Sequence, residues 1–61
     1  MGVSKHIFED CEVICTPLQQ AGGAKPYYCR VYRDGRQVLA VTIPEADTPS
    51  EAAKEARAFI V

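Results

Sequence analysis

The chain has 61 residues with a net charge of −1, and 48% of its side chains are apolar while 25% are charged. These proportions are typical of one globular domain, here residues 1–61, and they exclude an intrinsically disordered chain. A domain of this length has little room for a deep substrate cavity. With this net charge, the protein has no overall electrostatic attraction to nucleic acid or anionic membranes. No stretch approaches a membrane span or a signal-peptide core, so we expect a cytoplasmic protein.

The N-terminal third of the chain predicts one strand. Residues 1–6 are expected to be frayed, and residues 10–16 are expected to form a strand because they are rich in strand-favouring residues that alternate in polarity. A helix remains an open alternative, since several apolar residues also recur at helical spacing: Ile7, Phe8, Cys11, Ile14, Cys15 and Leu18. Pro17 and the Gly22-Gly23 pair then predict a loop running to about Lys25.

Three cysteines, Cys11, Cys15 and Cys29, have no spacing typical of a zinc site. On a strand, the sulfurs of Cys11 and Cys15 would lie about 13 Å apart, too far to share a metal ion or a disulfide. Cys29 could face one of them across two strands. We therefore predict buried thiols, with no metal site and no cofactor.

The middle of the chain predicts a β-hairpin, with strands over residues 26–32 and 36–43 and Asp34-Gly35 between them. A two-residue loop would pair Arg33 with Arg36 and mix apolar with polar residues on each face. A three-residue loop over residues 33–35 pairs Tyr32 with Arg36 and separates the two sets. We predict this second register, in which one face holds Tyr27, Cys29, Val31, Leu39, Val41 and Ile43.

The C-terminal part predicts an amphipathic helix over residues 49–60. Thr48 and Glu51 have the spacing of a capping box, and Pro49 occupies the first helical position. The expected buried stripe consists of Ala52, Ala53, Ala56, Phe59 and Ile60. The predicted fold is thus a two-layer α+β domain, a three-stranded antiparallel meander with one helix on one face.

One helix can cover only one face of such a sheet, and the other face is expected to hold four aromatic or basic side chains. These are Tyr28, Arg30, Tyr32 and Arg36. Tyrosine and arginine are enriched in protein interfaces, and they also stack on the bases of single-stranded RNA. Both residue types are also well suited to the solvent side of an ordinary sheet, because their side chains have apolar bodies. No catalytic constellation is recognised, because Glu9, Asp10 and Glu12 are expected to be solvated.

The hairpin followed by IPEADTPSEAAKEARAFI resembles the N-terminal part of HicB-type antitoxins and related small uncharacterised bacterial proteins. The resemblance covers roughly residues 26–60, and its matching positions are Pro44, Thr48, Glu51, Ala52 and Ala56. It implies a partial ribonuclease-H-like or double-stranded-RNA-binding-like fold without catalytic residues. The same layout is similar to that of some small phage-encoded inhibitors of bacterial defence systems, such as anti-CRISPR proteins.

The sequence therefore predicts a small non-catalytic module that binds a protein partner through the open sheet face. The unpaired edge of a three-stranded sheet further predicts a homodimer. Inhibition of a bacterial defence system and binding of single-stranded RNA are the alternative functions. No small-molecule substrate and no membrane contact are expected.

Overall fold

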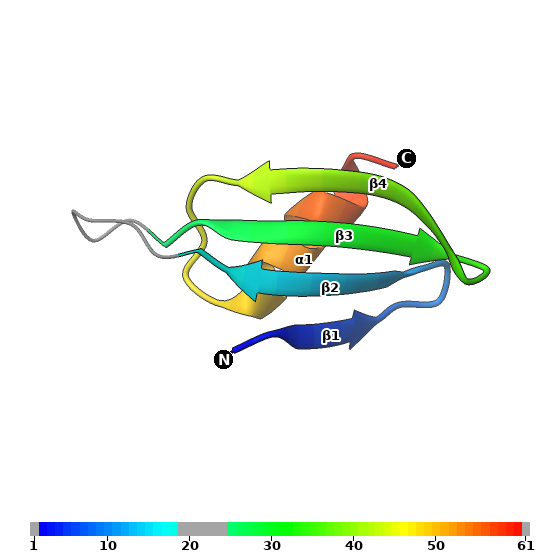
Figure 1. Ribbon diagram of the computed structural model, residues 1–61, viewed down its shortest axis with the longest axis horizontal. Coiled ribbons are helices and arrows are strands. Elements are labelled where there is room, and N and C mark those ends of the chain that lie inside the picture. Colours follow the sequence, from blue (N-terminus) through cyan, green and yellow to red (C-terminus); the bar gives the residue numbers. More distant parts are fainter. Residues whose placement is uncertain (1, 19–24, 61) are drawn as a thin grey trace.

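The computed structural model describes residues 2–18 and 25–60, which form four antiparallel strands and one helix. The strands β1 (Ser4–Ile7), β2 (Glu12–Pro17), β3 (Tyr27–Arg33) and β4 (Arg36–Ile43) make one sheet in that order. The helix α1 (Pro49–Ala58) crosses one face of this sheet diagonally (Figure 1). The predicted two-layer α+β architecture is confirmed, with one strand more than predicted.

The additional strand is β1, which pairs with β2 from Ser4 opposite Cys15 to Ile7 opposite Glu12. The expectation that residues 1–6 are frayed is therefore wrong for the residues of β1. Four residues give too weak a pattern to predict a strand alone, but the free edge of β2 offers a row of backbone donors and acceptors. A hydrogen bond of 2.8 Å from the amide of Phe8 to the carbonyl of Cys11 closes the turn between the strands. The helical alternative for residues 6–16 is excluded.

The β3–β4 hairpin has the predicted faces, but its loop length and its register next to the loop differ from the prediction. Asp34 and Gly35 have φ angles of 54° and 78°, as in a two-residue type I′ loop. Arg33 accordingly pairs with Arg36, and the register then shifts between Val31 and Tyr32. The predicted three-residue loop is wrong, but this β-bulge restores the pairing of odd with odd residues along the rest of the hairpin.

The core lies between the sheet and α1. Val13, Cys15, Cys29 and Val31 from the central strands have no exposed surface, and Tyr27 and Ile43 are buried beside them. From α1, the buried residues are Ala52, Ala53 and Ala56. Because these side chains are small, the helix lies close to the sheet, and the Cys29 Sγ is 3.8 Å from the carbonyl oxygen of Ala52. The prediction that the odd-numbered hairpin residues face the helix is confirmed.

The predicted capping interaction at the start of α1 is present. The Thr48 Oγ1 accepts a hydrogen bond of 3.2 Å from the amide of Glu51, and Pro49 begins the helix. The helix ends at Ala58, two residues earlier than predicted, and Phe59 is its C-cap. Phe59 is 61% exposed, so its expected place on the buried stripe is wrong, whereas Ile60 packs partly against the core.

Removing the N-cap by Thr48→Ala should lower the free energy of unfolding by about 1 kcal/mol, because the amide of Glu51 loses its acceptor. The matched control is Ser50→Ala, which removes a hydroxyl from an exposed position in the first turn. Urea denaturation followed by circular dichroism measures both. Equal effects of the two substitutions would show that the cap does not contribute.

The loop predicted after Pro17 lies largely outside the described residues, including its Gly22-Gly23 pair. On either side of it, the amide of Leu18 donates a 3.0 Å hydrogen bond to the carbonyl of Pro26, which continues the pairing of β2 with β3. Within residues 2–18 and 25–60, no helix has the length and apolar character needed to cross a membrane.

Candidate interaction surface

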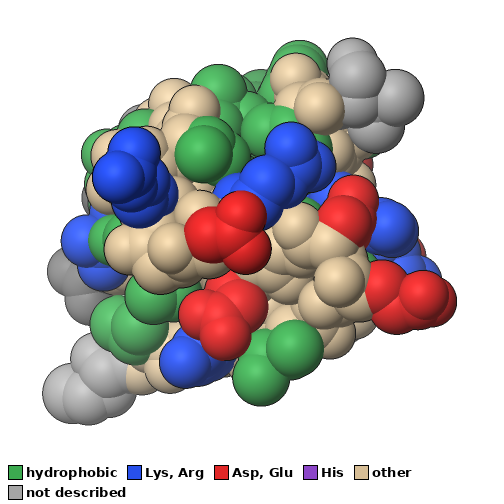
Figure 2. Space-filling view, turned by 90° about the vertical axis from the view of Figure 1, so that its right-hand side faces the viewer, with side chains coloured by type: hydrophobic (Ala, Val, Ile, Leu, Met, Phe, Trp, Pro, Cys, Tyr) green, Lys and Arg blue, Asp and Glu red, His purple; other side chains and the backbone are tan. Residues whose placement is uncertain are grey.

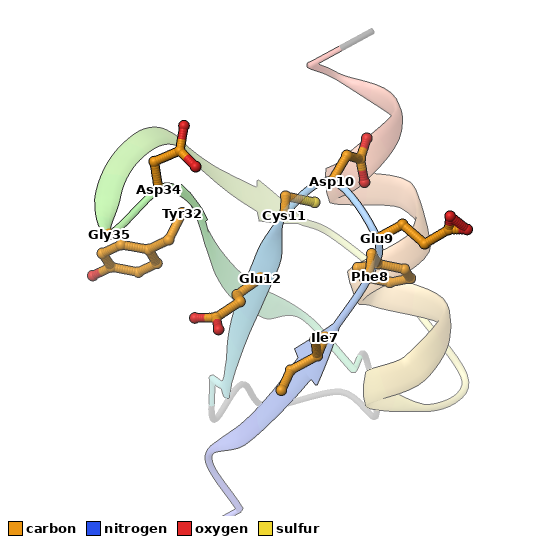
Figure 3. Close-up of a pocket in the computed structure, with 9 residues that line it drawn as sticks. All are labelled: Ile7, Phe8, Glu9, Asp10, Cys11, Glu12, Tyr32, Asp34 and Gly35. Carbon is orange, nitrogen blue, oxygen red and sulfur yellow. The ribbon is translucent and has the colours of Figure 1, made fainter.

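The sheet surface opposite α1 is called here the open face. Its side chains come from all four strands, at positions that alternate with the buried residues. They are Lys5, Ile7, Glu12, Ile14, Thr16, Tyr28, Arg30, Tyr32, Gln37, Ala40 and Thr42. In Figure 3, the side chains of Glu12 and Tyr32 point away from α1, as this alternation requires. The helix α1 lies on the opposite side of the sheet (Figure 1).

Arg30 occupies the centre of the open face. It lies on β3 between Tyr28 and Tyr32, which are two residues away on the same side of the strand, and its cross-strand neighbours are Ile14 and Ala40. The Nε atom of Arg30 is buried and has no hydrogen-bond partner within the described ranges. A buried donor without an acceptor costs about 1–3 kcal/mol, so the Nε–H group of Arg30 has an unmet hydrogen bond.

The two tyrosines flanking Arg30 are partly exposed. Tyr28 has 37% of its surface exposed, and Tyr32 is half-buried. Both rings thus combine an apolar body with an accessible surface, as is usual for contact residues. The structure brings Tyr28, Arg30 and Tyr32 together on one strand as predicted from the sequence.

Arg36 does not belong to the open face. The sequence placed it opposite Tyr32, but Tyr32 pairs with Gln37, and Arg36 pairs with Arg33. Cross-strand partners project to the same side of a sheet, so Arg36 and Arg33 lie on the helix side at the hairpin end. This part of the predicted site is wrong because the two-residue loop shortens the hairpin connection by one residue.

The other charged side chains of the open face neutralise each other. The Lys5 Nζ lies 3.6 Å from the Glu12 Oε1. Arg30, in contrast, forms no ion pair with any described residue. The open face therefore has one unpaired positive charge, and this charge is surrounded by tyrosine and aliphatic side chains.

At the hairpin end of the sheet, acidic and basic side chains gather on the surface (Figure 2). The central residue is Asp10, in the β1–β2 turn. Its Oδ1 accepts a 3.0 Å hydrogen bond from the Arg57 Nε, and its backbone carbonyl accepts one of 3.2 Å from the Arg33 Nε. The guanidinium of Arg57 also lies 4.9 Å from the centre of the Phe8 ring. These contacts join the turn to α1 and β3, so Asp10 has a structural role that its expected solvated state did not include.

The hydrogen bond from Arg57 lowers the pKa of the Asp10 carboxyl below its ordinary value of 3.8. Because the folded-state pKa is the lower one, this interaction stabilises the fold fully above about pH 3.8 and is lost as the pH falls through the folded-state value. Asp10→Asn should therefore destabilise the protein at neutral pH, and its difference from the wild type should shrink below pH 3.8. Urea denaturation across this pH range measures the difference, with Glu9→Gln as the matched exposed control. A difference that is independent of pH would contradict the ionic interaction.

A hollow of about 330 Å³ lies at the same end, between the β1–β2 turn and the β3–β4 hairpin. Figure 3 shows its lining residues, which include four carboxylates together with Ile7, Phe8, Cys11, Tyr32 and Gly35. One of the carboxylates, Asp10, already interacts with Arg57. In the part of the chain that the structure describes, no three histidine, cysteine or acidic side chains are grouped as metal ligands.

The cysteines lie in the core, as predicted. Cys15 and Cys29 are direct cross-strand partners, and their sulfur atoms are 3.4 Å apart. Burial raises the pKa of the Cys29 thiol to about 12 and also raises the pKa values of Cys15 and Cys11. A thiol with a raised pKa is a poor nucleophile at neutral pH, so the three cysteines act as small core residues.

Two features of the surface were missed by the sequence reasoning. β1 extends the open face by Lys5 and Ile7, and Arg30 forms no ion pair with any described residue. Glu12 lies two residues before Ile14 on β2, and the sequence did not indicate that Glu12 would interact with Lys5. Comparison with known proteins adds no further constraint, because no protein-family model, no curated protein and no solved structure matches this chain.

Proposed function

We propose that this chain is a non-catalytic interaction module of the cytoplasm that binds a protein partner through the open face and functions as a homodimer. The observation that supports the partner site best is the position of Arg30 at the centre of that face, with its Nε buried and without an acceptor. An antitoxin-like or accessory role, or inhibition of a bacterial defence system, agrees with the resemblances of the sequence.

The chemistry of the open face limits the kind of partner. Arg30 is suited to bind an acidic side chain, since a carboxylate accepts two parallel hydrogen bonds from a guanidinium group. Tyr28, Tyr32 and Ile14 around it call for apolar or aromatic side chains. The partner surface should therefore present a carboxylate surrounded by apolar residues.

The double substitution Arg30→Ala/Tyr32→Ala tests this proposal. Each side chain is partly exposed, so the thermal unfolding temperature should change little. Partner affinity should fall by at least roughly thirtyfold, the effect of losing one interface hot spot of about 2 kcal/mol. The measurement is quantitative capture from the native host, followed by titration of the recovered protein against each variant.

The matched control is Lys54→Ala/Glu55→Ala, which truncates two exposed side chains on the outer surface of α1. A protein lost with the open-face variant but retained with this control supports the proposal. Retention of the partner by both variants, or a loss of stability in the open-face variant with the partner retained, would show that the open face is not the contact surface.

Single-stranded RNA is a second candidate, favoured by the arrangement of Tyr28 and Tyr32 on either side of Arg30 along one strand. Bases could stack on the rings while the guanidinium group contacts a phosphate. Fluorescence anisotropy of a labelled single-stranded RNA dodecamer should then show binding that weakens steeply with added salt. A flat titration at low salt would exclude this function.

A further inference from the structure

The two edges of the sheet differ in length and polarity. β1 has four residues and includes Lys5 and His6, whereas β4 has eight residues and only one charged side chain, Arg36, at its start. Among the described residues, no strand pairs with the outer side of β4. A long edge with a single charged residue at its start leaves a row of backbone donors and acceptors open to pairing with another strand.

Apolar side chains flank this edge on both sides of the sheet. Leu39 and Val41 are only half-buried because α1 packs mainly against β2 and β3 and less against β4. The chain leaves α1 on the side of β4 (Figure 1), and this segment includes the exposed Phe59. Val38, on β4 at the bulge, is 49% exposed. A partner strand along β4 would thus gain apolar contacts as well as hydrogen bonds.

The charges at the two ends of β4 favour a second copy of the same chain as the partner. Arg36 begins the strand, while the exposed Glu45 follows its end. When two copies of a strand pair antiparallel, the start of each lies beside the end of the other. Arg36 of one copy would therefore come beside Glu45 of the second copy, and this favourable pair would occur twice.

We infer that two copies of this chain associate through antiparallel pairing of their β4 strands, which joins their sheets into one of eight strands. Leu39, Val41 and Phe59 of both copies then cover the seam on the helix side. This inference rests on the homodimer of the proposed function and specifies its interface. It leaves Arg30 and the two tyrosines accessible to a different partner. Dimerisation is measured by molecular mass and partner binding by capture, so a failure of one can be distinguished from a failure of the other.

A charge exchange tests the pairing most specifically. Within one chain, Arg36 and Glu45 are separated by about 30 Å of extended strand, so any interaction between them must join two copies. Arg36→Glu should weaken the dimer about tenfold by placing like charges together at both ends. Arg36→Glu/Glu45→Arg should restore the wild-type dimerisation constant. Sedimentation equilibrium measures all three, and absence of rescue would overturn the antiparallel arrangement.

A second pair of variants tests the edge itself. The wild type should have twice the chain mass of 6.7 kDa by light scattering, and Val38→Lys/Phe59→Lys should be a folded monomer by scattering and circular dichroism. The matched control, Val3→Lys/Leu18→Lys, makes the same change at two exposed apolar residues away from β4 and should remain dimeric. A monomeric wild type, or equal loss of mass in both variants, would contradict the inference. A monomeric wild type that loses its captured protein only in the first variant would instead identify β4 as the site of a foreign strand.

Discussion

Ile43→Ala is expected to destabilise the domain by about 2–5 kcal/mol, since it removes most of a side chain that is 2% exposed in the core. Ile43 ends β4 opposite Tyr27, so the cavity would lie between the sheet and the segment that leads into α1. A domain of this length has roughly 3–9 kcal/mol of total stability. Differential scanning calorimetry should show a fall of at least about 8 °C in the unfolding temperature.

Ile7→Ala is the control for this substitution, because Ile7 is 72% exposed on the open face. The same atoms are removed there without opening a cavity, so the unfolding temperature should stay within about 2 °C of the wild type. Similar losses at both positions would mean that the open face is covered in the isolated protein. That result would contradict the one-sided burial of the sheet.

Ala52→Leu is expected to cost about 1–3 kcal/mol by overpacking. Ala52 has no exposed surface, and its carbonyl oxygen lies 3.8 Å from the Cys29 sulfur, so there is no space for a larger side chain between α1 and β3. Alanine and leucine have similar helix propensities, which leaves packing as the cause. Urea denaturation should show a lower midpoint for this variant.

Ala58→Leu provides the matched substitution at an exposed position at the end of the same helix. Its midpoint should differ little from that of the wild type. If Ala58→Leu were as destabilising as Ala52→Leu, the effect would arise from the helix itself rather than from its distance to the sheet.

The sequence was informative where local chemistry and burial agree. The capping pattern of Thr48 and Glu51 predicted the start of the helix, because both signals lie within four residues. The division of β3 into a buried set with Cys29 and Val31 and an exposed set with Tyr28 was also predictable, since alternation along a strand has a fixed period of two residues.

The position of Arg36 was not predictable from this alternation. Two different connections give the same buried set along most of the hairpin, a three-residue loop or a two-residue loop with a later bulge. They differ only in the residues between the loop and the bulge. These residues are little buried, so burial does not favour one connection over the other. Arg36 lies in that interval, so burial alone could not place it on the helix side.

β1 and Phe59 were missed for different reasons. β1 is a strand because it pairs with the edge of β2. This pairing is a tertiary interaction, and the local sequence of four residues does not indicate it. Phe59 has the spacing of a buried helical position, but the helix ends one residue before it. Its exposure depends on where the last turn stops relative to the sheet.

We propose that the open face around Arg30 contacts a protein partner. The most direct test is a titration of the isotope-labelled chain with the recovered partner, followed by amide chemical shifts. We expect the largest changes at Tyr28, Arg30 and Tyr32 and their neighbours on β2, with little change at the exposed Lys54 and Glu55 of α1. Changes concentrated on α1, with the residues of β3 unaffected, would contradict it.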